Sequence, residues 1–199
     1  MTPRLILIRH PRTQPDPALP ASQWRLSPEG EAQIRALVAA PFWDGVTTVY
    51  TSREYKAAVV GEAISAAHGI PHRAVPDLRE ARRDVWLGPD AFLAAQRAFF
   101  ARPYAPPVPE WESGAAAQAR FVRAMDGLLA SHPAGESLAV VSHASVLTLY
   151  LAYLRGQPPD IDDWNAIGFA AVMLVKRETL RPVSSFVLAP YTGLESARP

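Results

Sequence analysis

Residues 5–13 read LILIRHPRT, and this stretch decides the fold. Four aliphatic residues without polar alternation predict a strand over residues 4–9 that is covered on both faces. Such strands are typical of parallel sheets with helices on both sides. The run ends on Arg9 and His10, and Pro11 follows. Because ligands of open α/β sheets bind beyond the carboxyl ends of the strands, we expect Arg9 and His10 to lie at a binding crevice.

The rest of the chain alternates between strand-like and helix-like segments. Further strands are expected at 46–52, 72–78 and 137–143, with two late strands at 169–177 and 182–190 joined by a hairpin. Helices are expected at 26–40, 52–69, 90–101, 115–131 and 144–156, the first capped by Ser27 and the second by Ser52. This order predicts an α/β three-layer sandwich: a mostly parallel central sheet, helices on both faces and an antiparallel edge. We expect residues 1–199 to form a single domain.

Composition excludes several classes of protein. The chain has 199 residues, a formal net charge of +1 and no cysteine. It therefore has no disulfides, no thiolate metal sites and no cysteine nucleophile. The charge gives no reason to expect nucleic acid or an anionic membrane as a partner. No apolar run reaches the roughly 18 residues of a membrane-spanning helix, and we expect a cytoplasmic protein.

Polar residues gather where four of the predicted strands end. Arg9 and His10 end the first strand, and Lys56 lies one turn into the helix that follows the second. Glu80 follows the third strand. His143 ends the fourth, and Ala144 opens the next helix. Each residue alone is more typical of a solvated surface or a satisfied half-buried histidine, but the topology brings them to one rim.

Phosphoryl transfer through histidine fits this set of side chains. A neutral imidazole is a competent nucleophile near pH 7. The transferring phosphoryl group carries negative charge, which the Arg9 fork, the Lys56 ammonium, a protonated His143 and the helix N-terminus at Ala144 can bind. A carboxylic acid must protonate the leaving oxygen and then activate water, and Glu80 is placed for this.

Five stretches, in order, resemble the motifs of the histidine phosphatase superfamily, which has the phosphoglycerate mutase-like fold. They are LIRHPRT (7–13), LSPEGEAQ (26–33), TSREYKAAVVGEAI (51–64), LREAR (78–82) and VVSHASVLTLYL (140–151). The chain most resembles a small bacterial phosphatase subgroup of that superfamily.

The resemblance implies a role for each matching residue. His10 is the phosphorylated nucleophile, Arg9 and His143 bind the phosphoryl group, Glu80 is the proton donor, and Thr13 belongs to the first motif. It implies no metal and no organic cofactor. It also implies a small phosphorylated substrate and inorganic phosphate as ligands.

Three residues depart from the motifs, one of them Arg53, which stands where a proline is usual. Pro11 replaces a glycine and removes a backbone N–H. Lys56 replaces an arginine and loses the bidentate fork. The leading interpretation is a phosphomonoesterase that uses a phosphohistidine on His10. The alternatives are a mutase of the phosphoglycerate type and a catalytically silent protein that binds a phosphorylated ligand. Asp77 and Asp84 remain alternative acids to Glu80.

Residues 81–113 are a candidate lid over the site, because Arg82, Arg83, Trp86, Phe92 and Trp111 offer side chains for substrate recognition. The same segment also fits helical packing. The sequence allows a monomer or a homodimer.

Overall fold

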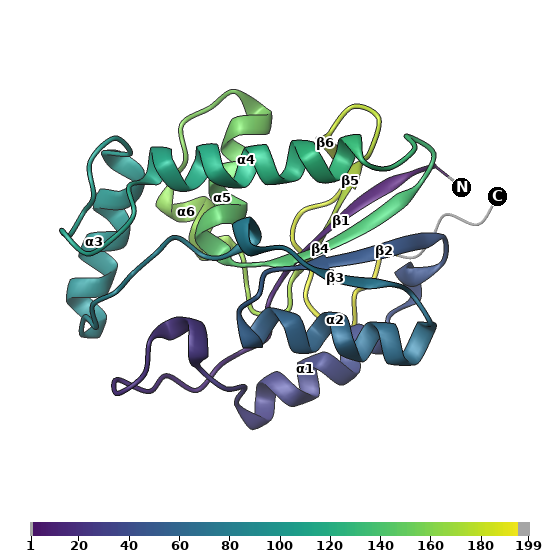
Figure 1. The fold of residues 1–199 in the computed structure, drawn as a ribbon, viewed down its shortest axis with the longest axis horizontal. Helices are drawn as coiled ribbons and strands as arrows, with labels where there is room; N and C mark the ends of the chain where they lie inside the picture. Colours follow the sequence, from purple (N-terminus) through teal and green to yellow (C-terminus); the bar gives the residue numbers. More distant parts are fainter. Residues whose placement is uncertain (1, 195–199) are drawn as a thin grey trace.

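The computed structural model describes residues 2–194, which build a six-stranded sheet between layers of helices (Figure 1). Its strands are Arg4–Arg9 (β1), Val46–Thr51 (β2), His72–Ala74 (β3), Ser137–Ser142 (β4), Val172–Lys176 (β5) and Arg181–Pro182 (β6). The strand order is β3-β2-β4-β1-β5-β6. The strands β1 to β4 run parallel, whereas β5 pairs antiparallel with β1 and β6. The predicted α/β sandwich with an antiparallel edge is confirmed.

Within residues 2–194, six helices and three short 3₁₀ turns connect the strands. The helices are Pro28–Val38 (α1), Tyr55–His68 (α2), Pro89–Ala101 (α3), Gly114–Ala130 (α4), Ala144–Arg155 (α5) and Ile161–Ala166 (α6). The 3₁₀ turns are Ala21–Gln23 (η1), Pro41–Trp43 (η2) and Pro76–Leu78 (η3). The sequence predicted the first five helices but neither α6 nor the 3₁₀ turns. None of the helices in residues 2–194 is long and apolar enough to cross a membrane.

The strand β1 shows why an unbroken apolar run marks a central strand. Leu5 and Leu7 pack into the cluster formed with α4 and α5, whereas Ile6 and Ile8 pack into the cluster formed with α1 and α2. All four side chains are fully buried. Figure 1 shows α4 and α5 on one side of the sheet and α1 and α2 on the other. Burial of each such side chain stabilises the fold by about 1.5–3 kcal/mol.

The start of α1 fixes the loop that follows His10. Ser27 caps the helix as predicted and accepts a hydrogen bond from the Gly30 N–H at 3.1 Å. A Cβ at Gly30 would lie 2.1 Å from the Arg12 carbonyl oxygen, so only glycine allows this approach. Gln33 accepts a hydrogen bond from the Arg12 N–H at 2.8 Å. Two residues of the second motif therefore hold the loop in place.

The prediction that Ser52 caps the second helix was wrong. The helix α2 begins at Tyr55, and its N-cap is Glu54, which makes no side-chain capping bond. The Ser52 hydroxyl instead lies 2.8 Å from His143 Nε2 and accepts from the Glu54 N–H at 3.2 Å. Ser52 thus supports a site residue.

Three strands are markedly shorter than predicted, and the one expected at 169–177 covers only Val172–Lys176. The strand β3 ends at Ala74, because Pro76 has no N–H to continue the ladder and begins η3 instead. The late segment 182–190 is mostly irregular: β6 covers only Arg181–Pro182, and one isolated bridge joins Val187 to Val172. The Ser184 hydroxyl accepts the hydrogen bond from the Leu174 N–H at 3.0 Å, which interrupts the backbone ladder.

Candidate active site

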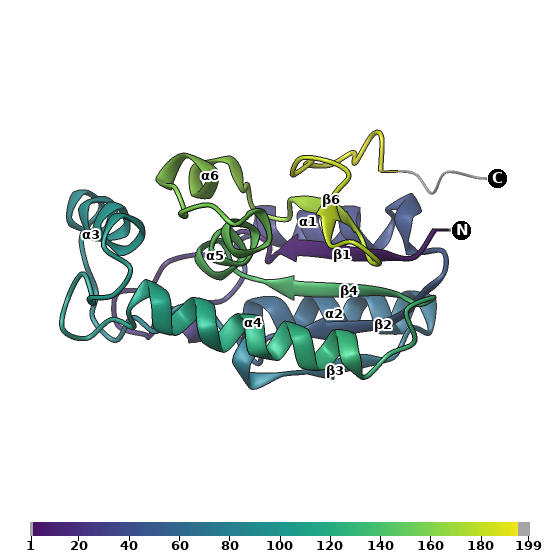
Figure 2. The ribbon, with the colours of Figure 1, turned by 90° about the horizontal axis from the view of Figure 1, so that it is seen from above.

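A cavity of about 720 Å³ opens at the carboxyl ends of the parallel strands. In Figure 2 the arrowheads of β1 and β4 point toward the end of the molecule that carries α3. The cavity is lined there by Arg9, His10, Thr13, Lys56, Glu80 and Ala144. His143 lies behind this lining and is fully buried. The structure therefore brings together every residue that the sequence predicted for the site.

His10 is held as a neutral imidazole of one tautomer. Its Nδ1 atom lies 2.7 Å from the Pro11 carbonyl oxygen. A carbonyl only accepts, so Nδ1 carries the proton and Nε2 keeps its lone pair. Burial, followed by repulsion from His143 and nearby cations, lowers the pKa of His10 well below its usual value. The proline that replaces glycine thus still supplies the carbonyl that orients the ring.

Arg9 presents a guanidinium group beside His10. One of its nitrogens donates to the Ile167 carbonyl, and the group stacks 3.8 Å from the ring centre of Phe169. Among the described residues its Nε–H has no hydrogen-bond partner. Burial lowers the pKa of Arg9 to about 10, so the group remains cationic at neutral pH. Arg9 can therefore bind an anion in the cavity.

His143 stands between His10 and a carboxylate. Its ring centre is 5.0 Å from that of His10, and its Nε2 atom is 2.8 Å from the Ser52 hydroxyl and 3.6 Å from Glu54 Oε1. Burial lowers the pKa of His143 to about 4, and Glu54 opposes this shift. Its Nδ1 atom is buried and makes no hydrogen bond within residues 2–194.

Glu80 reaches the cavity by a different route from the one predicted. It follows η3 rather than a strand end, and the Ser142 hydroxyl of β4 fixes this connection by donating to the Leu78 carbonyl at 2.8 Å. Glu80 accepts from the Ala81 N–H at 2.9 Å and from the Ser145 N–H at 3.2 Å. The predicted anion site at the start of α5 therefore has one amide bonded to Glu80.

The electrostatic surroundings of Glu80 favour its charged form. Burial raises its pKa, but Arg83, at 3.4 Å from Oε2, and His143 outweigh this effect and lower it overall. The alternative acids are placed differently. Asp77 does not line the cavity, whereas Asp84 lines its outer part and pairs with Arg82.

Lys56 forms an ion pair with Glu54, a residue that the sequence analysis did not assign to the site. Its Nζ atom lies 2.6 Å from Glu54 Oε2 and donates to the Ala21 carbonyl at 2.6 Å. Glu54 Oε1 also accepts from the Glu80 N–H at 2.8 Å. Burial raises the pKa of Glu54, but His143, Lys56 and these hydrogen bonds hold it at about 2. An acid before a helix reads as ordinary dipole complementation, so no sequence signal marked Glu54.

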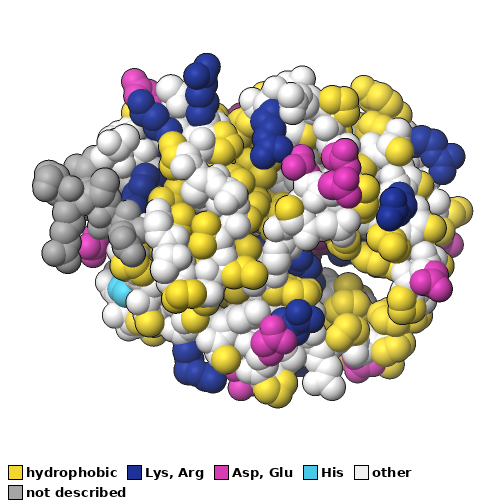
Figure 3. Space-filling view, turned by 180° about the vertical axis from the view of Figure 1, so that it is seen from behind, with side chains coloured by type: hydrophobic (Ala, Val, Ile, Leu, Met, Phe, Trp, Pro, Cys, Tyr) yellow, Lys and Arg dark blue, Asp and Glu magenta, His cyan; other side chains and the backbone are white. Residues whose placement is uncertain are grey.

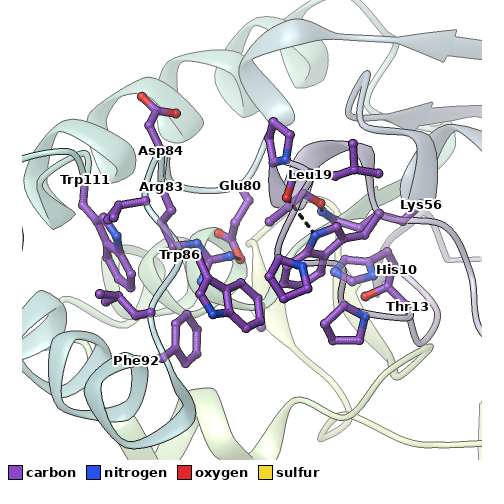
Figure 4. Close-up of a pocket in the computed structure, with 18 of the residues that line it drawn as sticks. His10, Thr13, Leu19, Lys56, Glu80, Arg83, Asp84, Trp86, Phe92 and Trp111 are labelled. Carbon is purple, nitrogen blue, oxygen red and sulfur yellow. Dashed lines mark hydrogen bonds and ion pairs between the residues drawn. The ribbon is translucent and has the colours of Figure 1, made fainter.

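The outer part of the cavity is lined by aromatic and proline side chains. Figure 3 shows a hollow bordered by hydrophobic side chains. In Figure 4 the residues of the loop after β1 face Trp86, Phe92 and Trp111 across it. Segment 81–113 therefore forms one wall of the cavity. A bridge between Arg83 and Trp111 closes this segment on itself, and Glu112 anchors it to Arg120 at 2.8 Å.

The site holds no group of side chains suited to a metal ion. Within residues 2–194 no three or more histidines, cysteines or acids gather in such an arrangement.

Comparisons with known structures support the same fold. YhfR from Bacillus stearothermophilus is 21% identical, with 94% of this chain and 95% of that one covered and a TM-score of 0.71. A mycobacterial glucosyl-3-phosphoglycerate phosphatase with inorganic phosphate is 21% identical over 98% and 100% of the two chains, with a TM-score of 0.74. A mutant phosphoserine phosphatase from Entamoeba histolytica in complex with phosphoserine is 16% identical over 92% and 95%, with a TM-score of 0.70.

A search of curated protein sequences returned no match. The sequence model of the histidine phosphatase superfamily (branch 1) matches residues 5–186, which is most of the chain. The match includes both histidines, the arginine beside His10 and the acid at position 80. The protein belongs to the histidine phosphatase superfamily.

Proposed function

We propose that this protein is a cofactor-independent phosphomonoesterase that hydrolyses a small phosphate ester through a phosphohistidine on His10. The hydrogen bond from His10 Nδ1–H to the Pro11 carbonyl carries this proposal, because it leaves the Nε2 lone pair free in the cavity. The phosphatases among the structural neighbours, one with inorganic phosphate and one with phosphoserine, support the same chemistry.

The first step forms a bond between His10 Nε2 and phosphorus. The bond from phosphorus to the ester oxygen breaks, and the electron pair stays on that oxygen. Arg9 and Lys56 offset the negative charge of the transferring group. Glu80 gives its proton to the departing oxygen, which leaves as an alcohol.

Glu80 must therefore hold a proton when the ester is bound, although the pKa of its carboxyl is lowered in the site described above. A phosphate dianion beside Glu80 raises that pKa by like-charge repulsion. Substrate binding thus promotes the protonated form that the first step requires.

The second step returns the site to its starting state. The Glu80 carboxylate takes a proton from water while the water oxygen attacks phosphorus. The bond to Nε2 breaks, phosphate leaves, and the imidazole regains its lone pair. Glu80 ends the cycle with the proton that it needs for the next ester.

A silent protein that binds a phosphorylated ligand is the second candidate, and one observation favours it. The buried Glu54 carboxylate forms an ion pair with the Lys56 ammonium group. This pairing reduces the positive charge available to a phosphoryl group. A mutase of the phosphoglycerate type gains no comparable support.

The test is hydrolysis of 4-nitrophenyl phosphate by the purified protein in the presence of a chelator. We expect turnover that vanadate inhibits and that His10→Ala abolishes. The control is His68→Ala, since His68 is an exposed histidine outside the cavity. Full activity in His10→Ala would refute the nucleophile assignment. Phosphate binding without turnover on a broad panel of esters would favour the silent protein.

A further inference from the structure

The cavity is much larger than a phosphate group, and its outer part has a distinct composition. Beyond His10 the walls are formed by five aromatic side chains, which we call the aromatic chamber: Trp24, Trp86, Phe92, Trp111 and Trp164. The chamber contains four of the five tryptophans in the chain.

On one side of the chamber lie Trp24 and Trp86, and the indole N–H of Trp24 is already hydrogen-bonded within the protein. The Trp24 Nε1–H donates to the carbonyls of Asp16 and Leu19, at 3.0 and 3.2 Å. Trp86 makes an edge contact with Trp24 at 5.8 Å between ring centres. It remains 48% exposed, and exposed aromatic surface in a concave site is typical of ligand binding.

The other side combines ring surface with unused donors. Phe92 lies 5.7 Å from Trp111 and 6.3 Å from Trp164, measured between ring centres. The Nε1 atoms of both tryptophans are buried and find no acceptor among the described residues. Both nitrogen atoms are shielded from solvent, so a ligand in the chamber would contact the ring surfaces of these tryptophans and not their N–H groups.

The charged residues of the outer cavity are already engaged. Arg83 contacts Glu80 at 3.4 Å and lies 5.3 Å from the ring centre of Phe92. Asp84 pairs with Arg82, and in Figure 4 its carboxylate points away from the other labelled side chains. The lining of the chamber therefore offers no unpaired cation for a substrate carboxylate, such as that of a phosphoglycerate.

We propose that the aromatic chamber binds the alcohol portion of the substrate, and that the substrate is a phosphate monoester of an aromatic alcohol. This inference rests on the proposed function, because the phosphoryl group must lie at His10 for the alcohol portion to extend into the chamber.

The first test compares esters with similar alkyl leaving groups, so that intrinsic reactivity does not decide the result. We expect kcat/KM for 2-naphthylmethyl phosphate to exceed that for glycerol 1-phosphate and 3-phosphoglycerate by about 10- to 100-fold, from the apolar surface buried. Trp86→Ala should lower this ratio several-fold. Tyr104→Ala, which removes an aromatic ring that is exposed outside the cavity, should leave the ratio unchanged.

The second test measures binding and needs no turnover. By calorimetry, 2-naphthylmethylphosphonate should bind at least about tenfold more tightly than methylphosphonate, and Trp86→Ala should remove most of the difference. Equal affinity of the two phosphonates would overturn the chamber proposal. So would polar esters hydrolysed as fast as the aromatic ester, and in that case the proposed phosphatase function would stand. Tight naphthyl binding without hydrolysis of any ester would support the chamber and refute the phosphatase function.

Discussion

The Nζ atom of Lys56 lies 2.6 Å from Oε2 of Glu54, and both side chains are almost completely buried near His10 and His143. An entering phosphoryl group must therefore share Lys56 with a carboxylate that is already bound to it. The same carboxylate holds the backbone of Glu80 through the Glu80 N–H. The pair thus connects Lys56, the proposed phosphate-binding residue, to the backbone of Glu80, the proposed acid.

Replacing Glu54 by glutamine separates these two effects. Glu54→Gln keeps an oxygen acceptor for the Glu80 N–H but removes the negative charge beside Lys56. We expect inorganic phosphate to inhibit the variant about tenfold more strongly, because one repulsive charge is lost and one cation is freed. The measurement is the inhibition constant of phosphate at fixed ionic strength.

Glu62→Gln is the matched control, since Glu62 is exposed on α2 and does not line the cavity. Its phosphate inhibition should equal that of the wild type. Unchanged or weaker inhibition of Glu54→Gln would mean that Glu54 does not compete with phosphate for Lys56.

Arg83 is expected to control the protonation of Glu80. Its NH2 atom lies 3.4 Å from Glu80 Oε2, and this cation is the largest influence that lowers the pKa of the carboxyl. Arg83→Gln should raise that pKa. The basic limb of kcat against pH, where the acid loses its proton, should then move to higher pH.

Arg82→Gln provides the comparison, because Arg82 is exposed and pairs with Asp84 instead. It should leave the pH profile of kcat in place. A basic limb that stays where it is in Arg83→Gln would indicate that another group supplies the proton.

Alanine substitutions at Gly30 and Gly127 should change the free energy of unfolding in opposite directions. A Cβ at Gly30 meets the Arg12 carbonyl oxygen at 2.1 Å, whereas a Cβ at Gly127 meets nothing within 4 Å. Gly30→Ala should lower the free energy of unfolding by about 2 kcal/mol or more and reduce kcat/KM, since the loop after His10 must move. Gly127→Ala, in an exposed position of α4, should raise stability by up to about 1 kcal/mol. Urea denaturation measures both, and equal stability of the two variants would contradict this account of the loop.

The buried His143 should make stability depend on pH. Its pKa is about 4 in the folded protein against 6.5 for the free side chain, so the unfolded chain takes up a proton first as the pH falls. This group costs no stability above pH 6.5, and its cost grows to about 3 kcal/mol as the pH falls to 4. Urea denaturation between pH 4 and 7.5 should show a loss that is smaller by about this amount in His143→Gln. Parallel pH curves for the two proteins would show that His143 titrates normally in the folded state.

The sequence predicted the inner site well because strand ends of a parallel sheet converge. The apolar run before Arg9 identified β1, and the strand before His143 identified β4, which is its direct neighbour. The ordered motifs then implied Glu80. What could not be predicted depends on loops. Glu54 looks like an ordinary acid before a helix, and its burial follows from the path of the segment that carries Glu80.

The sequence predicted only part of the aromatic chamber, because tertiary packing brings its residues together. The sequence proposed Trp86, Phe92 and Trp111 as recognition side chains but not Trp24 or Trp164. Trp24 lies in the loop before α1 and Trp164 lies in α6, and tertiary packing rather than periodicity brings them together. Whether segment 81–113 moves as a lid remains a prediction.

The central claim is that His10 carries the phosphoryl group during turnover. The most direct measurement is to mix the protein with a phosphate ester, quench it within milliseconds in alkaline denaturant, which preserves phosphohistidine, and map the modified residue by mass spectrometry. The account predicts a phosphoryl group on Nε2 of His10 that forms and decays at rates compatible with turnover, and none in His10→Ala. Turnover without a phosphorylated His10, or a phosphoryl group on another residue, would contradict it.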